Sequence, residues 1–246
     1  MKNEFEKLNK IINLTSPQLI LLTGNRHFIE ELSGDIANNV CLKQEWEVLE
    51  VVSCKKEYLI KRMLVNEANA NYKKWTLKNE YSDNELKQIG KAIVKVIEVT
   101  KRLPTIIEQN LYDLKGIVKL VTAFANYYAD REQVNALVVL DIVQLNTIHK
   151  EKYKRQIIKL IRRLKQISMK LRCPIIFTYK NENNNNDYLT KNDIYNINKI
   201  NKYVDTFIIT NSNNEKRDVF DIDIYDNKNK IGTYKLKYDF ICRKFE

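Results

Sequence analysis

Two apolar segments of the chain each end in a residue type that can take part in chemistry. Residues 19–23 read LILLT and lead into Gly24 and Asn25, and residues 136–140 read ALVVL and lead into Asp141. Short apolar runs of this kind predict buried parallel strands, and ligands bind beyond the carboxyl ends of such strands. A glycine lets backbone N–H groups approach a phosphate, and an aspartate can hold Mg²⁺. The two strand ends therefore predict a nucleotide site at one edge of a sheet.

The rest of the chain supplies the elements that would position this edge. Further strands are predicted at 47–53, 104–108 and 174–178, and helices at 3–14, 28–40, 55–71, 113–128, 150–171 and 191–199. Another helix begins at Ser82, which forms a capping box with Glu85 and is followed by Ile89, Ile93 and Ile97. Four strands, at 206–210, 219–225, 232–238 and 240–245, are expected to form an antiparallel edge. This order predicts an α/β fold with a mainly parallel central sheet flanked by helices and an antiparallel C-terminal edge.

Composition narrows the class of protein. The 246 residues, 44% of them hydrophobic, suit one large α/β domain. No apolar run approaches the ~18 residues that would span a bilayer, and the N-terminal sequence MKNEFEKLNK is too charged for a signal peptide. Four cysteines and two histidines lie too far apart to indicate a metal site. We expect a cytoplasmic protein without a metal centre.

The net charge of +11 has two readings. It favours binding to a polyanion such as nucleic acid. It is also the charge of a lysine-rich surface in a chain that uses lysine and asparagine throughout. Composition alone leaves both readings open.

Four segments, in the order in which they occur, resemble the C-terminal RecA-like motor domain of DnaB-type replicative DNA helicases. LILLTGN at 19–25 is similar to the strand that enters the phosphate loop, and ALVVLDIVQL at 136–145 to the Walker B strand. LRCPIIFTYKNE at 171–182 resembles the next strand, and KIGTYKLKYDFICRKF at 230–245 the closing hairpin. The resemblance implies a RecA-like P-loop NTPase fold over residues 17–246, preceded by an N-terminal helix or linker at 1–16. It also implies a role in DNA replication.

The phosphate loop departs from the family's pattern. Such a loop needs glycines around the phosphates, Lys for their charge and Ser or Thr for Mg²⁺. The corresponding stretch begins Gly24-Asn25-Arg26, and the position of the lost Lys falls on Ile29 or on Glu30. We therefore predict a vestigial nucleotide site in which no Gly-Lys-Thr motif holds ATP.

The other site positions that the resemblance implies are also altered. The family's catalytic Glu falls on Ser53, or on Cys54 in a shifted register, and neither is a carboxylate. The arginine finger falls on Asn227, with Lys228 or Lys230 nearby. Asp141 matches the family's Walker B aspartate, and Gln144 follows it as in the family. We interpret Asp141 as a residue inherited from the family that now has a structural role.

The helix 150–171 is the strongest basic feature of the sequence. Together with Arg172 it carries ten positive charges against one acid, Glu151. Such a run is usually a solvated face, but this excess also suits DNA or an acidic partner. The candidate binding residues are Lys159, Arg162, Arg163, Lys165 and Arg172.

Three functions remain open. The first is a catalytically inactive, helicase-like protein that binds a helicase, a helicase loader or another replication protein, or a second copy of itself, and needs no cofactor. The second is a divergent ATP-dependent DNA helicase that uses ATP and Mg²⁺. The third is a single-stranded-DNA-binding module that uses the basic helix.

Overall fold

The computed structural model describes residues 12, 14–24, 26–52, 56–71, 73–74, 81–100, 105–108, 114–129, 135–141, 150–179, 200–212, 218–226, 229–240, 242 and 244–245. Its strands are β1 (Leu19–Gly24), β2 (Glu47–Val52), β3 (Thr105–Glu108), β4 (Ala136–Leu140), β5 (Ile175–Tyr179), β6 (Thr206–Ser212), β7 (Val219–Asp226), β8 (Lys230–Asp239) and β9 (Lys244–Phe245). Its longer helices are α2 (Arg26–Gln44), α3 (Lys56–Ala68), α5 (Asp83–Thr100), α6 (Leu114–Ala129) and α7 (Lys150–Leu171). Of the helices predicted at 3–14 and 191–199, only Ile12 and Leu14 lie within the described residues.

The strands form one sheet in the order β3-β2-β4-β5-β1-β6-β7-β8-β9. The pairs from β3 to β6 are parallel, and those from β6 to β9 are antiparallel. The predicted parallel sheet with an antiparallel C-terminal edge is confirmed, and the apolar strands β1 and β4 are both internal. Residues 206–210 were expected in the antiparallel edge, and β6 does pair antiparallel with β7; on its other side it joins the parallel part of the sheet through β1. Leu21 of β1 pairs with Phe207 in parallel register, because strand direction is set by the connection and not by the apolar pattern.

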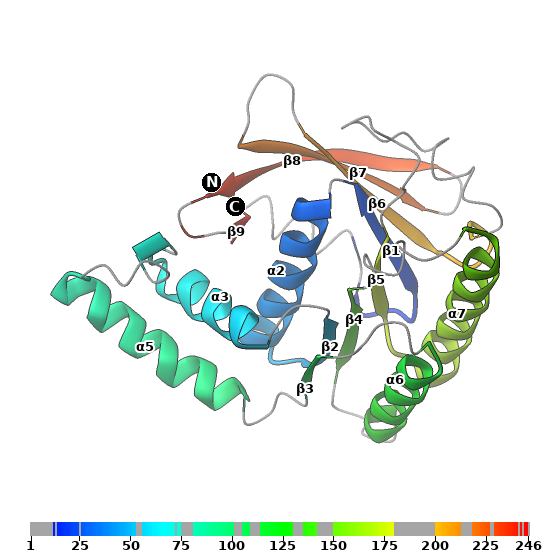
Figure 1. Ribbon diagram of the computed structural model, residues 1–246, viewed down its shortest axis with the longest axis horizontal. Helices are drawn as coiled ribbons and strands as arrows, with labels where there is room; N and C mark the ends of the chain where they lie inside the picture. The colour runs from blue at the N-terminus through cyan, green and yellow to red at the C-terminus, as the bar shows by residue number, and fades with distance from the viewer. Residues whose placement is uncertain are drawn as a thin grey trace.

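Helices cover both faces of the sheet (Figure 1). One core lies beneath α6 and α7 and takes alternate residues of the strands, such as Leu21, Val138 and Phe177. The other lies beneath α2 and takes the intervening residues, such as Leu22 and Val139. This alternation is the period-two pattern of a strand that is buried on both faces.

The chain before β1 packs on its own domain where it is described. Ile12 and Leu14 are 1% and 4% exposed and belong to the core beneath α2. The side-chain amide of Gln18 donates a hydrogen bond to the carbonyl of Ile12. These contacts fix the chain as it enters β1.

Helix α5 lies at the end of the molecule opposite α7 (Figure 1). Its predicted capping box is confirmed, because the backbone N–H of Ser82 donates to Glu85 Oε2 at 2.8 Å and that of Glu85 donates to Ser82 Oγ at 3.3 Å. Ile89 is buried against α3, whereas Ile93 and Ile97 are 38% and 51% exposed. The expected apolar series of this helix is therefore divided between two faces.

No helix within the described part of the chain is both long enough and apolar enough to cross a membrane.

Candidate functional site

The connection between β1 and α2 is very short. Only one residue, Asn25, separates Gly24 at the end of β1 from Arg26 at the start of α2. Gly24 has φ of 141°, and a β-carbon there would lie 2.1 Å from Oγ1 and 2.2 Å from the carbonyl oxygen of Thr210 on β6. Gly24 is therefore required by its close contact with the neighbouring strand.

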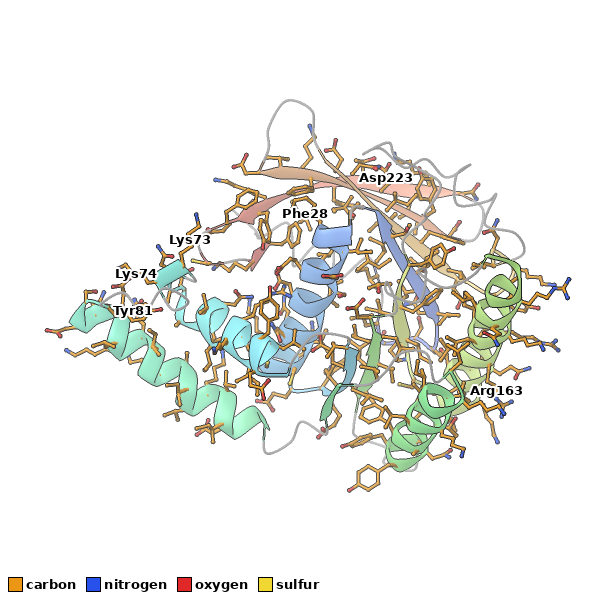
Figure 2. All side chains as sticks on the ribbon, viewed as in Figure 1. Phe28, Lys73, Lys74, Tyr81, Arg163 and Asp223 are labelled. Atoms are coloured by element: carbon orange, nitrogen blue, oxygen red, sulfur yellow. The ribbon has the colours of Figure 1, made fainter. Side chains whose placement is uncertain are left out.

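The first turns of α2 are packed against the body of the protein. Ile29 is fully buried in the core beneath α2, beside Ile20 and Leu22 of β1. The ring centroid of Phe28 lies 3.7 Å from that of Phe220 on β7 and 5.8 Å from that of Tyr238 on β8. Figure 2 shows Phe28 at the amino end of α2, beside the C-terminal strands. This end of the helix is held by aromatic and aliphatic contacts.

Asp141 lies immediately after β4 and is 7% exposed. One carboxylate oxygen accepts a 2.9 Å hydrogen bond from Oγ1 of Thr178, which is fully buried on β5. The backbone N–H of Asp141 donates to the carbonyl of Val51 on β2 at 2.8 Å. Asp141 thus joins three adjacent strands, β2, β4 and β5, at their carboxyl ends.

A buried arginine lies between α2 and α3. Arg62 is 2% exposed, and it forms ion pairs with Glu31 (Nε–Oε2, 2.8 Å) and Asp35 (Nη2–Oδ1, 2.5 Å). Its guanidinium also donates to the carbonyls of Glu30 and Glu31. A β-carbon on Gly34 would lie 2.6 Å from Nη1 of Arg62, so a glycine at this position lets the guanidinium cross α2.

Burial raises the pKa of two carboxyl groups around Arg62. The pKa of Asp35 rises to about 6, because burial outweighs Arg62 and the hydrogen bond from the N–H of Phe245. The pKa of Glu50 on β2 rises to about 7, since burial and the charges of Asp141 and Asp35 outweigh Arg62. Both carboxyl groups therefore have pKa values near neutral pH, and both lie on the α2 side of the sheet.

The sequence did not single out this acid–arginine cluster. Arg62 lies between Leu59 and Met63, which are both buried, and the helical spacing of the three was the available signal. A charged residue in an amphipathic helix is ordinarily assigned to the exposed side. Arg62 is buried because Glu31 and Asp35, one turn apart on α2, both face it.

Several of the predicted site residues are not among those that the structure describes. Asn25, Ser53, Cys54, Gln144, Asn227 and Lys228 are not among the described residues, and Arg26 is described only as part of the α2 backbone. Lys230, offered as a substitute for the arginine finger, forms an ion pair with Asp223 across 2.7 Å. Its ammonium also lies 5.8 Å from the ring centroid of Tyr225. In the structure, Lys230 therefore interacts with two side chains of the neighbouring strand β7.

The basic helix α7 presents most of its candidate residues to solvent. Lys159, Arg162, Arg163 and Arg172 are exposed, and Ile161 and Leu164 pack in the core. Arg163, labelled in Figure 2, donates to Oε1 of Gln166 on the same helix at 3.0 Å. The structure therefore leaves four of the five predicted cations exposed, three of them on consecutive turns of α7 and Arg172 directly after the helix.

Lys165 differs from the other four. Its ammonium contacts both carboxylate oxygens of Asp205 at 2.6 Å, and Asp205 also accepts a 2.7 Å hydrogen bond from the N–H of Leu19. Lys165 therefore links α7 to the start of β1 and to the chain before β6. We define the basic face of α7 as the exposed side chains of Lys159, Arg162 and Arg163.

Comparison with known proteins agrees with this arrangement. One solved structure, described as an ATPase domain, superposes with a TM-score of 0.79 at 13% identity, covering 98% of this chain and 89% of that one. A DnaB-like replicative helicase, described with its interactions with primase, gives a TM-score of 0.79 at 14% identity; 98% of this chain is covered, and it spans 61% of the helicase. These likenesses confirm the RecA-like fold. No curated protein matches the chain. The family model of the DnaB-like helicase C terminal domain matches residues 1–246, and the chain therefore belongs to that family.

Proposed function

We propose that this protein is a catalytically inactive member of the DnaB-like helicase family that acts in DNA replication by binding another protein. The observation that carries the proposal is the first turn of α2, where Phe28 and Ile29 pack into the protein at the place where the family's fold holds the phosphates of ATP. A domain that keeps its fold and uses this turn for packing acts through its surfaces.

The residues at this turn do not fit a nucleoside triphosphate. A phosphate loop places several residues between its strand and its helix so that successive N–H groups wrap the phosphates. Here one residue separates β1 from α2, and Gly24 is pressed against Thr210. Ile29, one of the two positions for the lost Lys, is fully buried and apolar. No catalytic step is therefore derived through ATP.

The nearby carboxylates do not restore the site. Glu31 is held by Arg62, and Asp141 accepts a hydrogen bond from Thr178. Holding Mg²⁺ at a phosphate also requires the loop's Ser or Thr and the phosphate oxygens themselves. Asp141 is explained by its bonds to β2 and β5 without a metal ion.

The basic face of α7 is the surface that we assign to partner binding. Its exposed cations lie on a helix that is fixed to the sheet by Leu160, Ile161 and Leu164, so the charges are presented on a rigid support. An acidic protein surface would be steered toward such a face. One structural neighbour is a replicative helicase described with its interactions with primase. This likeness directs the search toward replication proteins such as a helicase or a helicase loader.

The test is a comparison of binding by three forms of the full chain. The wild type, the Arg162→Glu/Arg163→Glu variant and the Asp141→Asn variant would each be used to capture proteins from host extract, followed by titration of the replication protein that is recovered. The proposal expects Asp141→Asn to bind like wild type and the charge reversal to bind more weakly. Equal binding by the charge reversal and loss of binding by Asp141→Asn would refute it.

A second candidate function is binding of single-stranded DNA by the same face. It is favoured by the grouping of Arg162, Arg163 and Lys159 on consecutive turns of α7 and by the net charge of +11. Contacts to phosphates release counterions, so the affinity would fall steeply with salt. Titration of a labelled oligonucleotide at two salt concentrations separates DNA from an acidic protein as the ligand.

A further inference from the structure

Strand β8 has one edge that is mostly open. On one side β8 pairs with β7 along its length, and on the other side β9 covers only Tyr238 and Asp239. Within the described part of the chain, no other strand pairs with β8, which lies along the border of the sheet (Figure 1). Residues 233–237 therefore form an open edge, to which a further strand can add.

The backbone groups on this open edge belong to alternate residues. The N–H of Tyr238 donates to the carbonyl of Asp218 at 2.7 Å, so Tyr238 directs its backbone toward β7. Opposite residues of an antiparallel pair exchange hydrogen bonds only at every second position. Thr233, Lys235 and Lys237 occupy the intervening positions, and their N–H and C=O groups therefore point away from β7. The open edge thus offers these groups to an extended backbone.

The side chains beside these groups are basic. Thr233, Lys235 and Lys237 are all exposed, and they lie on one face of β8 because side chains alternate along a strand. Lys235 forms no ion pair with a described residue, and Lys237 forms only a long one, 3.8 Å from Asp218. A residue added opposite either lysine would place its side chain on the same face, where an acid is stabilised by the opposite charge.

We propose that the open edge of β8, residues 233–237, binds an extended acidic segment of a partner protein by strand addition. The segment would run antiparallel to β8, in line with β9, and would place acidic residues opposite Lys235 and Lys237. The residue between them would be apolar, because it lies beside the fully buried Leu236 on the side of the sheet that packs against α2. This surface is separate from the basic face of α7 and does not depend on it.

The same lysines oppose a second copy of the chain as the occupant. In the antiparallel register that overlaps residues 233–237 of two copies completely, Lys235 lies opposite Lys235. Like charges directly opposite one another destabilise a strand pair, and lysines on edge strands oppose self-association. The net charge of +11 adds repulsion between copies and attraction for an acidic partner. The charges therefore select an acidic partner.

Two N-methylated peptides test the strand pairing on the unmodified protein. The probe is the fluorescent peptide Glu-Val-Glu-Val-Glu with blocked ends, for which we expect a Kd of about 100 µM. In the proposed pairing the N–H groups of the Glu residues face β8, and those of the Val residues face away from it. Methylation of the Glu nitrogens should weaken binding by roughly tenfold or more, whereas methylation of the Val nitrogens should leave it unchanged. Equal affinities of the two methylated peptides would overturn strand addition.

Variants of the full chain separate the charge from the backbone. Lys235→Gln removes only the charge and should weaken binding several-fold. Lys235→Pro also removes the N–H that faces the open edge, which β7 does not use, and should abolish binding. Thermal unfolding checks that this variant is folded. Lys87→Gln changes an exposed lysine on α5, is the matched control, and should bind like wild type.

The remaining outcomes identify the occupant. A peptide in which Lys replaces Glu should not bind up to about 1 mM, and equal binding of the Lys and Glu peptides would overturn the acidic partner. No binding of the Glu peptide at about 1 mM would overturn the proposal as a whole. A dimer in sedimentation that Lys235→Pro disperses would identify a second copy as the occupant and would also overturn it.

Discussion

The ring of Phe28 lies 3.7 Å, centroid to centroid, from the ring of Phe220, and this contact joins the first turn of α2 to β7. The two residues are far apart in sequence: Phe28 lies on the helix that follows the parallel strand β1, and Phe220 lies on the antiparallel strand β7. Around them, Tyr238 and Phe245 form an aromatic cluster, with ring centroids of Phe220 and Phe245 5.9 Å apart. The end of α2 that would bind phosphate in a phosphate-loop protein here holds the C-terminal strands.

Replacing Phe28 with alanine should therefore reduce stability. Phe28 is half-buried, so we expect a loss of about 2 kcal/mol in the free energy of unfolding, from lost apolar burial and ring contacts. Urea denaturation measures it. Tyr127→Ala, at an exposed ring on α6, serves as the comparison and should cost less than half as much. An unchanged stability in Phe28→Ala would show that this turn is not a packing element.

Replacing Arg62 with methionine should be more costly. The change leaves Glu31 and Asp35 buried without their cation, and removal of one partner from a buried ion pair typically costs about 3–5 kcal/mol. Lys95→Met removes the cation of a more exposed pair, with Glu67, and should cost at most about 1 kcal/mol. Equal losses in the two variants would contradict the structural role assigned to Arg62.

The stability of the protein should depend on Glu50 in a pH-dependent way. Burial raises the pKa of this carboxyl from 4.5 to about 7, so the folded state holds more protons than the unfolded state between these values. Stability due to Glu50 is therefore full below about pH 4.5 and is lost as the pH rises through about 7. Glu50→Gln, which stays neutral, should be more stable than wild type at about pH 8 by on the order of 1–3 kcal/mol.

The difference between Glu50→Gln and wild type should shrink toward about pH 5, where wild-type Glu50 is mostly protonated. Urea denaturation of both proteins at the two pH values measures it. Burial also raises the pKa of Asp35 to about 6, so the free energy of unfolding depends on pH through Asp35 as well, and this contribution is the same in both proteins. A stability difference that stays constant with pH would contradict the assignment.

The strands near the site could be predicted because β1 and β4 are buried on both faces, which leaves continuous apolar runs in the sequence. The direction of β6 could not be predicted, because an apolar run looks the same whether its neighbour is parallel or antiparallel. Asp141 was found for a related reason: a single carboxylate directly after a buried strand is conspicuous.

Arg62 and the exposed half of α5 could not be predicted from pattern alone. Helical periodicity indicates which residues share a face, but it does not indicate what that face meets. Ile93 and Ile97 continue the apolar series of Ile89, yet only Ile89 reaches α3. Arg62 is buried because α2 supplies two acids to it, which is a tertiary relationship between distant segments.

Charge reversal at Arg162 and Arg163 should weaken binding to an acidic partner or to single-stranded DNA. Both side chains are exposed, so the loss should be about 1–3 kcal/mol and larger at low salt. Lys165 is left unchanged because reversing it would break its ion pair with Asp205. Fluorescence anisotropy with a labelled ligand at two salt concentrations measures the change. Identical affinities for wild type and variant would show that the basic face of α7 does not bind the ligand.

The most direct test of the central claim is calorimetric titration of the full chain with ATP in the presence of Mg²⁺. Phe28 and Ile29 pack into the protein at the turn where phosphates would lie, and a single residue connects β1 to α2. We expect no ATP hydrolysis and no binding tighter than about 1 mM. A dissociation constant in the micromolar range would contradict it and would favour a divergent ATP-dependent helicase.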